Sequence, residues 1–149
     1  MTAVTVIPLA PEHEAAWRRL YHGYRSFYKN PQDGAVLDRL WGWLLDPAHP
    51  MEGLVAVRDG VPVGLAHVCA TPSPIRAADI GFLNDLFVDP EIRGARVGEA
   101  LLTAVADLAR DRGWPFVRWI TADDNYRART LYDRVAVKAG WNVYEMKAG

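Results

Sequence analysis

Apolar positions alternate in some stretches of the chain and recur every three or four residues in others, which predicts an ordered series of strands and helices. The alternation in Thr2–Pro8 predicts a first strand. After Pro11 the large apolar residues have helical spacing and form one aromatic stripe along a helix face. The stripe comprises Trp17, Leu20, Tyr21, Tyr24, Phe27 and Tyr28. A second helix is predicted over Ala35–Leu45, before Asp46-Pro47. Its expected inward positions are Val36, Leu40, Trp41 and Leu44.

The middle of the chain is rich in residues that favour strands. Gly53–Arg58 and Val61–Ala70 are β-rich runs that meet at Asp59-Gly60, a strong signal for a tight hairpin. Residues 71–74 read Thr-Pro-Ser-Pro and are expected to form a loop. Ile80–Val88 is the next predicted strand. These strands follow one another directly, so the sequence predicts an antiparallel run.

The last third of the chain returns to helical periodicity. Val97–Arg112 is the clearest helix of the sequence, and Gly113 after it is a typical C-terminal stop. A short strand at Phe116–Thr121, a helix at Asn125–Ala139 and a final strand at Trp141–Met146 follow. The order predicts an α+β (mixed α/β) domain. A doubly wound sheet is excluded because no crossover helices separate the middle strands.

Composition bounds the class of protein. A chain of 149 residues with 50% hydrophobic and 23% charged residues suits a single globular domain, residues 1–149. The net charge of -1 argues against a nucleic-acid-binding protein. The lone Cys69, a start without signal-peptide character and the lack of a long apolar stretch lead us to expect a cytoplasmic protein with no membrane span. The four histidines lack ligand spacing, so we expect no metal.

The stretch from Leu83 to Gly98 is the first to indicate chemistry. A strand enters a loop that contains Arg93, Gly94 and Gly98, and the loop leads into the longest helix. Free N–H groups and the positive dipole end of a helix start attract anions, and glycine lets a phosphate come close. The loop matches neither the P-loop nor the dinucleotide-binding motif. Taken alone, it fits a pyrophosphate site and an ordinary strand-to-helix connection equally well.

A second motif favours the pyrophosphate site. Arg93–Gly98 is similar to the pattern R/Q-x-x-G-x-G/A, and Asn125, Ala128 and Tyr132 match Asn-x-x-Ala-x-x-x-Tyr, followed by Gly140-Trp141. Together these motifs resemble the GNAT superfamily of N-acetyltransferases. Within it, the text LNDLFVDP looks most like the spermidine/spermine N-acetyltransferase branch.

The resemblance implies a fold and a cosubstrate. The fold is a mostly antiparallel sheet, splayed at the coenzyme site and flanked by helices, and the cosubstrate is acetyl-CoA. The edge formed by Leu86, Phe87 and Val88 would pair with the pantetheine arm and polarise the thioester carbonyl. Asn125, with Ala128, would contact the coenzyme from the opposite strand end. The pyrophosphate loop comprises Arg93, Gly94, Ala95, Arg96, Val97, Gly98 and Glu99.

Arg96 departs from the family pattern, which has glycine at this position. An arginine does not adopt positive φ cheaply, so the loop is predicted to be locally right-handed or slightly remodelled. Its guanidinium either points to solvent or adds a cation for a coenzyme phosphate, and we favour the first.

Acetyl transfer to an amine needs groups that move protons. An alkyl ammonium has a pKa of about 10.4 and must lose its proton before attack. Asp85 is the candidate base or amine ligand, and its structural alternative is a buried, hydrogen-bonded carboxylate. Polyamine acetyltransferases carry a glutamate where Asn84 stands, and strand alternation sends Asn84 and Asp85 to opposite faces. The family's general acid corresponds to Tyr132, whose alternative is a core tyrosine.

The acceptor amine is less well defined by the sequence. Tyr24 and Tyr28, with Trp119 and Asn84, are the candidate substrate-binding residues, although the aromatic stripe is expected to be mostly core. We expect transfer from acetyl-CoA to a primary amine of a small molecule, such as a polyamine, diamine or amino acid. The alternatives are a protein lysine or N-terminus, and a non-catalytic coenzyme A-binding regulatory module. A homodimer is an expectation from the family only.

Overall fold

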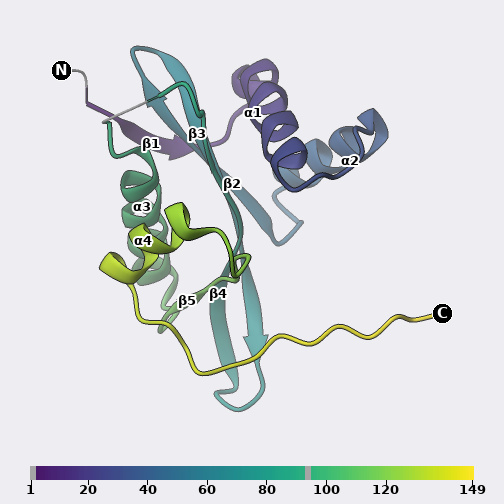
Figure 1. Cartoon of the computed structure of the whole chain (residues 1–149), viewed down its shortest axis with the longest axis vertical. Helices are drawn as coiled ribbons and strands as arrows, with labels where there is room; N and C mark the ends of the chain where they lie inside the picture. The colour runs from purple at the N-terminus through teal and green to yellow at the C-terminus, as the bar shows by residue number, and fades with distance from the viewer. Residues whose placement is uncertain (1–2, 93–94) are drawn as a thin grey trace.

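Five strands form one sheet in chain order, and helices cover both of its faces (Figure 1). The computed structural model describes residues 3–92 and 95–149. The strands are β1 (Thr5–Pro8), β2 (Met51–Arg58), β3 (Val61–Ser73), β4 (Ala78–Val88) and β5 (Val117–Arg118). The helices are η1, a 3-10 turn (Pro11–His13), α1 (Glu14–Phe27), α2 (Gly34–Leu45), α3 (Val97–Arg112) and α4 (Tyr126–Val135). The α+β architecture predicted from the sequence is confirmed.

The strands β1 to β4 pair antiparallel, and β5 joins β4 in parallel. The β2–β3 hairpin turns at Asp59 and Gly60, as predicted, with φ values of 55° and 77°. Two positive φ values in a row match the twist of the flanking strands. The antiparallel part of the sheet therefore follows from local turn chemistry, whereas the parallel pair needs α3 as its crossover.

Each face of the sheet has its own core. On one face, α1 and α2 bury Trp17, Leu20 and Trp41 against Leu65 of β3. On the other, α3 packs its apolar stripe onto β2, β3 and β4, and Leu131 and Tyr132 of α4 join that cluster. Figure 1 shows the two helix pairs on opposite sides of the strands. Alternate residues of β3 and β4 thus face different helices.

Helix ends follow the predicted caps with two corrections. The predicted α3 has the observed bounds, and Gly113 after it has a φ of 75°. In α2 the inward residue is Leu37 rather than Val36, because Leu37 lies four residues before the buried Trp41 and shares its helix face. The helix begins one residue earlier than predicted, and the Asp33 carboxylate caps it by accepting from the Ala35 N–H at 3.0 Å. The helix predicted over Asn125–Ala139 is shorter, since α4 ends at Val135.

Strand lengths differ more from the prediction. Residues 71–73 extend β3, because a long hairpin partner in β4 accepts them despite the two prolines nearby. The strand predicted over Phe116–Thr121 pairs at only two residues. The strand predicted over Trp141–Met146 is not formed, and residues 136–149 contain no helix or strand. A strand needs a partner, and neither of these two segments has a full one in the part of the chain that the structure describes.

None of the helices among the described residues combines the length and apolar character needed to cross a bilayer.

A close contact beside β5 supports a first prediction. A Cβ on Gly81 would meet the Trp114 ring at 2.6 Å and Val117 at 3.0 Å. We expect Gly81→Ala to lower the free energy of unfolding by about 1–3 kcal/mol through overpacking. The control is Gly42→Ala in α2, where a Cβ meets nothing within 4 Å and should stabilise the helix by about 0.5–1 kcal/mol. Urea unfolding measures both, and equal effects would contradict the packing argument.

Candidate active site

The strands β4 and β5 pair only at Gly81 with Val117 and at Phe82 with Arg118. Beyond Phe82, β4 continues for six residues beside β3 on one edge, with no strand of the described residues on the other. Leu86, Phe87 and Val88, predicted as the coenzyme-binding edge, lie in this part and are half-buried. Their backbone groups on the open edge can therefore pair with an extended, peptide-like ligand.

A β-bulge at Asn84 redirects the side chains at this opening. His67 of β3 opposes Asp85 and the next residue, Val68, opposes Leu83, which leaves Asn84 unopposed. The Asn84 side chain is exposed, and its amide donates to the Phe82 carbonyl at 3.3 Å and lies 3.4 Å from the Cys69 sulfur. Asp85 faces α1 instead. Asn84 and Asp85 therefore point to different surroundings, as predicted, but the bulge contributes to this as well as the alternation of side chains along a strand.

Asp85 belongs to a hydrogen-bonded chain that reaches the core. Its Oδ2 lies 2.7 Å from His67 Nδ1 and accepts from the Tyr21 hydroxyl at 3.1 Å. Trp17 Nε1 donates to His67 Nε2 at 2.9 Å. Because the indole N–H is only a donor, His67 Nε2 must be the acceptor, and the ring proton is on Nδ1, directed at Asp85. Trp17 and His67 are almost completely buried.

Opposing effects act on the Asp85 carboxyl. Burial favours the neutral acid and is the largest effect, but the hydrogen bonds from His67, Tyr24 and Tyr21 favour the anion. Together they hold the pKa of Asp85 below its ordinary value of 3.8. The same anion, after burial, raises the pKa values of Tyr21 and Tyr24. Asp85 is thus a stable carboxylate and a poor proton acceptor at neutral pH.

Aromatic rings line the path from Asp85 to the surface. Tyr21 and Tyr24 stack with centroids 5.4 Å apart, and Tyr24 meets Tyr28 at 5.0 Å and the edge of Phe87 at 6.0 Å. Tyr21 is 9% exposed and Tyr28 39% exposed, so the row leads outward from the carboxylate. Phe87 fits under α1 because Gly23 has no side chain, and a Cβ there would lie 3.1 Å from the ring.

The start of α3 corrects the expectation for Arg96. Arg96 is left-handed, with a φ of 53°, and it is the N-cap of α3. A left-handed arginine costs roughly 1–2 kcal/mol. The Arg96 side chain is 83% exposed, and its Nη1 lies 4.0 Å from Glu99 Oε2. Arg93 and Gly94 lie outside the described residues.

The first turn of α3 combines backbone N–H groups that lie outside the helical hydrogen bonds with close packing against α4. Among the described residues, the first helical bond runs from the Ala100 N–H to the Arg96 carbonyl, and the N–H groups of Val97, Gly98 and Glu99 have no helical acceptor. A Cβ on Gly98 would lie 3.1 Å from Leu131 of α4. Val97 is buried and Ala95 half-buried against the α3-side core. The positive end of the α3 dipole therefore lies close to the open edge of β4.

Asn125 and Ala128 have a structural role in this chain. The Asn125 side chain accepts from the Ala128 N–H at 3.4 Å and its amide lies 3.5 Å from the Thr121 hydroxyl oxygen. This is the N-cap of α4, and it accounts for the three-residue spacing of the two residues. Asn125 and Ala128, predicted to contact the coenzyme, thus form the hydrogen bond that caps the start of α4.

Tyr132 projects from α4 toward Trp119 and Tyr28. We call the gap between β4 and β5 beyond Phe82 the opening. Its ring meets that of Trp119, just after β5, edge to face with centroids 5.3 Å apart. Burial, and second the phenol of Tyr28, raise the pKa of Tyr132 to about 12. The hydroxyl is therefore protonated at neutral pH. Tyr132 thus lies against Trp119, which follows β5, and near Tyr28, the C-cap of α1.

His67 was missed as a site residue, because the four histidines were considered only as metal ligands. Its position offered a signal: it lies in a buried β-rich run, where an imidazole needs hydrogen-bond partners. Among the described residues, no three His, Cys, Asp or Glu side chains are grouped as metal ligands would be.

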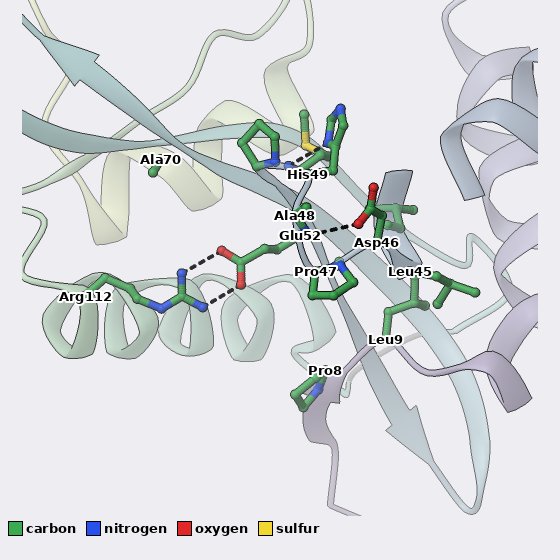
Figure 2. A pocket seen from close by; sticks show the side chains of 14 residues that line it. Pro8, Leu9, Leu45, Asp46, Pro47, Ala48, His49, Glu52, Ala70 and Arg112 are labelled. Carbon is green, nitrogen blue, oxygen red and sulfur yellow. Dashed lines mark hydrogen bonds and ion pairs between the residues drawn. The ribbon is translucent and has the colours of Figure 1, made fainter. Parts of the chain in front are cut away.

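The larger surface cavity lies elsewhere. It has a volume of about 580 Å³ and is lined by the end of α2, the start of β2 and Arg112 (Figure 2). Arg112 and Glu52 bind each other there through both guanidinium nitrogens. This pairing neutralises the charges of Arg112 and Glu52, and none of the residues around Asp85 lines the cavity.

The network around Asp85 predicts a pH-dependent stability. A carboxyl with a lowered pKa stabilises the fold above its ordinary value of 3.8, and this contribution is lost as the pH falls through the folded-state pKa. We expect Asp85→Asn to lower the free energy of unfolding by about 1.5–3 kcal/mol at pH 7 and by progressively less below pH 3.8. Urea unfolding at several pH values measures this, with exposed Asp79→Asn as control. A pH-independent loss would contradict the charged network.

Comparisons with known proteins agree with this geometry. The model of the acetyltransferase (GNAT) family matches residues 17–136. The chain is 29% identical to a D-amino-acid N-acetyltransferase of Saccharomyces cerevisiae, over 95% of this chain and 89% of that protein. It is 32% identical to an aminoglycoside N(6')-acetyltransferase of Stenotrophomonas maltophilia, over 75% of this chain and 71% of that protein.

A solved structure extends the agreement to the fold. An aminoglycoside N-acetyltransferase in complex with CoA superposes with a TM-score of 0.82 at 18% identity, over 100% of this chain and 97% of that one. At this identity the likeness concerns the fold alone. With the family match over most of its length, the chain belongs to the acetyltransferase (GNAT) family and is an acetyltransferase.

Proposed function

We propose that this acetyltransferase transfers an acetyl group from acetyl-CoA directly to the primary amine of a small molecule, within a ternary complex. The observation that carries the proposal is the partly buried Asp85 anion beneath a row of tyrosines, beside the open edge of β4. An anion with aromatic walls suits a compact ammonium group. The D-amino-acid and aminoglycoside acetyltransferases among its relatives support an amine of this size.

The coenzyme would lie along two features of the chain. The free amides of Val97, Gly98 and Glu99 would hold the pyrophosphate at the helix start. The open edge at Leu86, Phe87 and Val88 would pair with the pantetheine arm, and one of its N–H groups would polarise the thioester carbonyl. Gly98 suits this arrangement, because the absence of a side chain keeps α3 close to Leu131 and leaves its amide accessible.

Asp85 would act on the amine as a charge partner. Its lowered pKa makes it a weak base, so it would attract the ammonium through Tyr24 and Tyr28 rather than take its proton. The proton would leave through water, and the free amine would attack the thioester carbon. Asn84, exposed at the bulge, and Trp119 would form other walls of the acceptor site.

Tyr132 would supply the last proton. As the carbon–sulfur bond breaks, the departing thiolate would take a proton from the Tyr132 hydroxyl, and the proton that the attacking nitrogen loses on becoming an amide would return through water to the tyrosine. The raised pKa keeps the hydroxyl protonated before the reaction but also makes it a weaker acid, so Tyr132 would first stabilise the developing thiolate by a hydrogen bond and transfer the proton as the charge grows.

The coenzyme site predicts a specific loss of binding. We expect Gly98→Glu to weaken acetyl-CoA binding at least tenfold, because it places a negative charge and a bulky side chain at the helix start. Isothermal titration measures the affinity, and Gly42→Ala, far from the site, is the control with unchanged affinity. Thermal unfolding must show the variant folded. A folded variant with wild-type affinity would contradict the proposed pyrophosphate site.

The reaction predicts a defect in turnover alone for Tyr132→Phe. Thiol release from acetyl-CoA is measured with a panel of D- and L-amino acids, diamines, polyamines, aminoglycosides and a lysine peptide. We expect a small amine to be the preferred acceptor, and the variant to lower kcat about 100-fold or more while the acetyl-CoA affinity changes less than twofold. Tyr126→Phe, exposed on the same helix, is the matched control. Preference for the peptide would contradict the small-molecule proposal, and an unchanged kcat the role of Tyr132.

A further inference from the structure

The Asp85 carboxylate is held from behind by a histidine that the proposed reaction does not use. His67 and Asp85 oppose each other on β3 and β4, directly beside the bulge at Asn84. The side chain of His67 is 1% exposed and that of Asp85 is 18% exposed. His67 therefore has no surface from which to touch a substrate, whereas part of the carboxylate remains accessible.

Two contacts fix the protonation state of the His67 ring. Trp17 Nε1 donates to His67 Nε2 at 2.9 Å, so Nε2 carries no proton and the ring is the neutral form with its proton on Nδ1. That proton is directed at Asp85 Oδ2, which lies 2.7 Å from Nδ1. Any other form of the ring would place two N–H groups face to face between His67 and Trp17. A neutral ring donates a hydrogen bond without cancelling the charge of Asp85, which a histidinium would do.

Aromatic packing holds the His67 ring in this orientation. Its centroid lies 5.0 Å from that of Tyr21 and 5.9 Å from that of Trp17. The Tyr21 hydroxyl also donates to Asp85 Oδ2, at 3.1 Å. Because the bonds from His67 and Tyr21 both end on Oδ2, they leave the other carboxylate oxygen, Oδ1, for a ligand.

The other titratable groups near Asp85 come from α1. Burial, and then the charge of Asp85, raise the pKa values of Tyr21 and Tyr24, so both phenols stay neutral. Arg25 is a cation near the Tyr21 hydroxyl, and its Nη2 donates to the Pro31 carbonyl at 2.6 Å. Among the residues that the structure describes, Asp85 has no ion pair with a lysine or arginine, so a neutral His67 leaves its charge for the acceptor.

We propose that His67 is a positioning residue for the acceptor: fixed by Trp17 as the neutral Nδ1–H form, it holds Asp85 as a full anion and leaves Oδ1 for the ammonium group. The inference rests on the proposed function, in which Asp85 is the charge partner of the amine. It adds the reason why the site selects a cation, because one negative charge among aromatic rings favours an ammonium group over a neutral hydroxyl. Without the His67 donor, burial would favour the neutral acid and weaken this attraction.

Two substitutions of His67 separate its two hydrogen bonds. The amide nitrogen of asparagine, like histidine Nδ1, is two bonds from Cβ, so His67→Asn retains a donor for Asp85 and loses the acceptor for Trp17. The amide of glutamine, like histidine Nε2, is three bonds from Cβ, so His67→Gln retains the acceptor for Trp17 and loses the donor for Asp85. His22→Gln, exposed on α1, is the control, and thermal unfolding must show each variant folded.

Steady-state kinetics use the panel amine with the highest kcat/KM in the wild type. We expect His67→Gln to raise the KM for this amine about tenfold or more, with kcat changed less than about threefold. The increase should grow as the pH falls, because losing the donor raises the pKa of Asp85 and the carboxylate is neutralised while the amine stays an ammonium. His67→Asn should keep the KM within about threefold of the wild type. Equal KM values for the two variants would mean that His67 only fills space and would overturn the inference.

Asp85→Asn separates this inference from the proposed function. If it leaves the KM for the amine unchanged, the proposed role of Asp85 fails and the inference fails with it. If it raises the KM and His67→Gln does not, the inference alone is overturned. Nitrogen NMR of the wild-type protein needs no variant: we expect the Nδ1–H form of His67 at neutral pH, and the Nε2–H form would overturn the inference.

Discussion

The separation of β4 from β5 after two residue pairs is the constraint on which the rest of this structure depends. It arises at the contact of Gly81 with Trp114, which brings β5 close to one half of β4, and at the bulge of Asn84, which turns the other half. Backbone groups of a central strand are normally paired, so an unpaired stretch inside a sheet is suited to a ligand with peptide-like groups. The helices α3 and α4 then meet at this opening.

The second determinant is the charge on the α1 side of β4. A partly buried carboxylate is stable only with hydrogen-bond donors, and Asp85 has them from His67 and the tyrosines. Trp17 fixes the histidine ring from behind through its indole N–H. The core of the α1 face and the candidate amine site are therefore parts of one network. A change in the packing of Trp17 would reach the carboxylate through a single ring.

Much of the fold was predictable because its signals are local. The spacing in α3, the positive-φ turn at Asp59-Gly60 and the order of elements depend on neighbours in sequence. The GNAT motifs identified the family from a few residues near the start of α3 and α4. The strand ends at Ser73 and Arg118 were missed, because the length of a strand is decided by its partner.

By itself, then, the sequence determined the order of most helices and strands and the family, and it supplied the candidate residues for the site. Only the tertiary structure decided what several of them do. Long-range contacts assign the proton of His67, lower the pKa of Asp85 and raise that of Tyr132. The left-handed Arg96 and the Asn125 cap likewise depend on how helices dock. The reason is physical: propensity acts between neighbours in the chain, whereas burial and hydrogen bonding depend on distances between segments far apart in sequence.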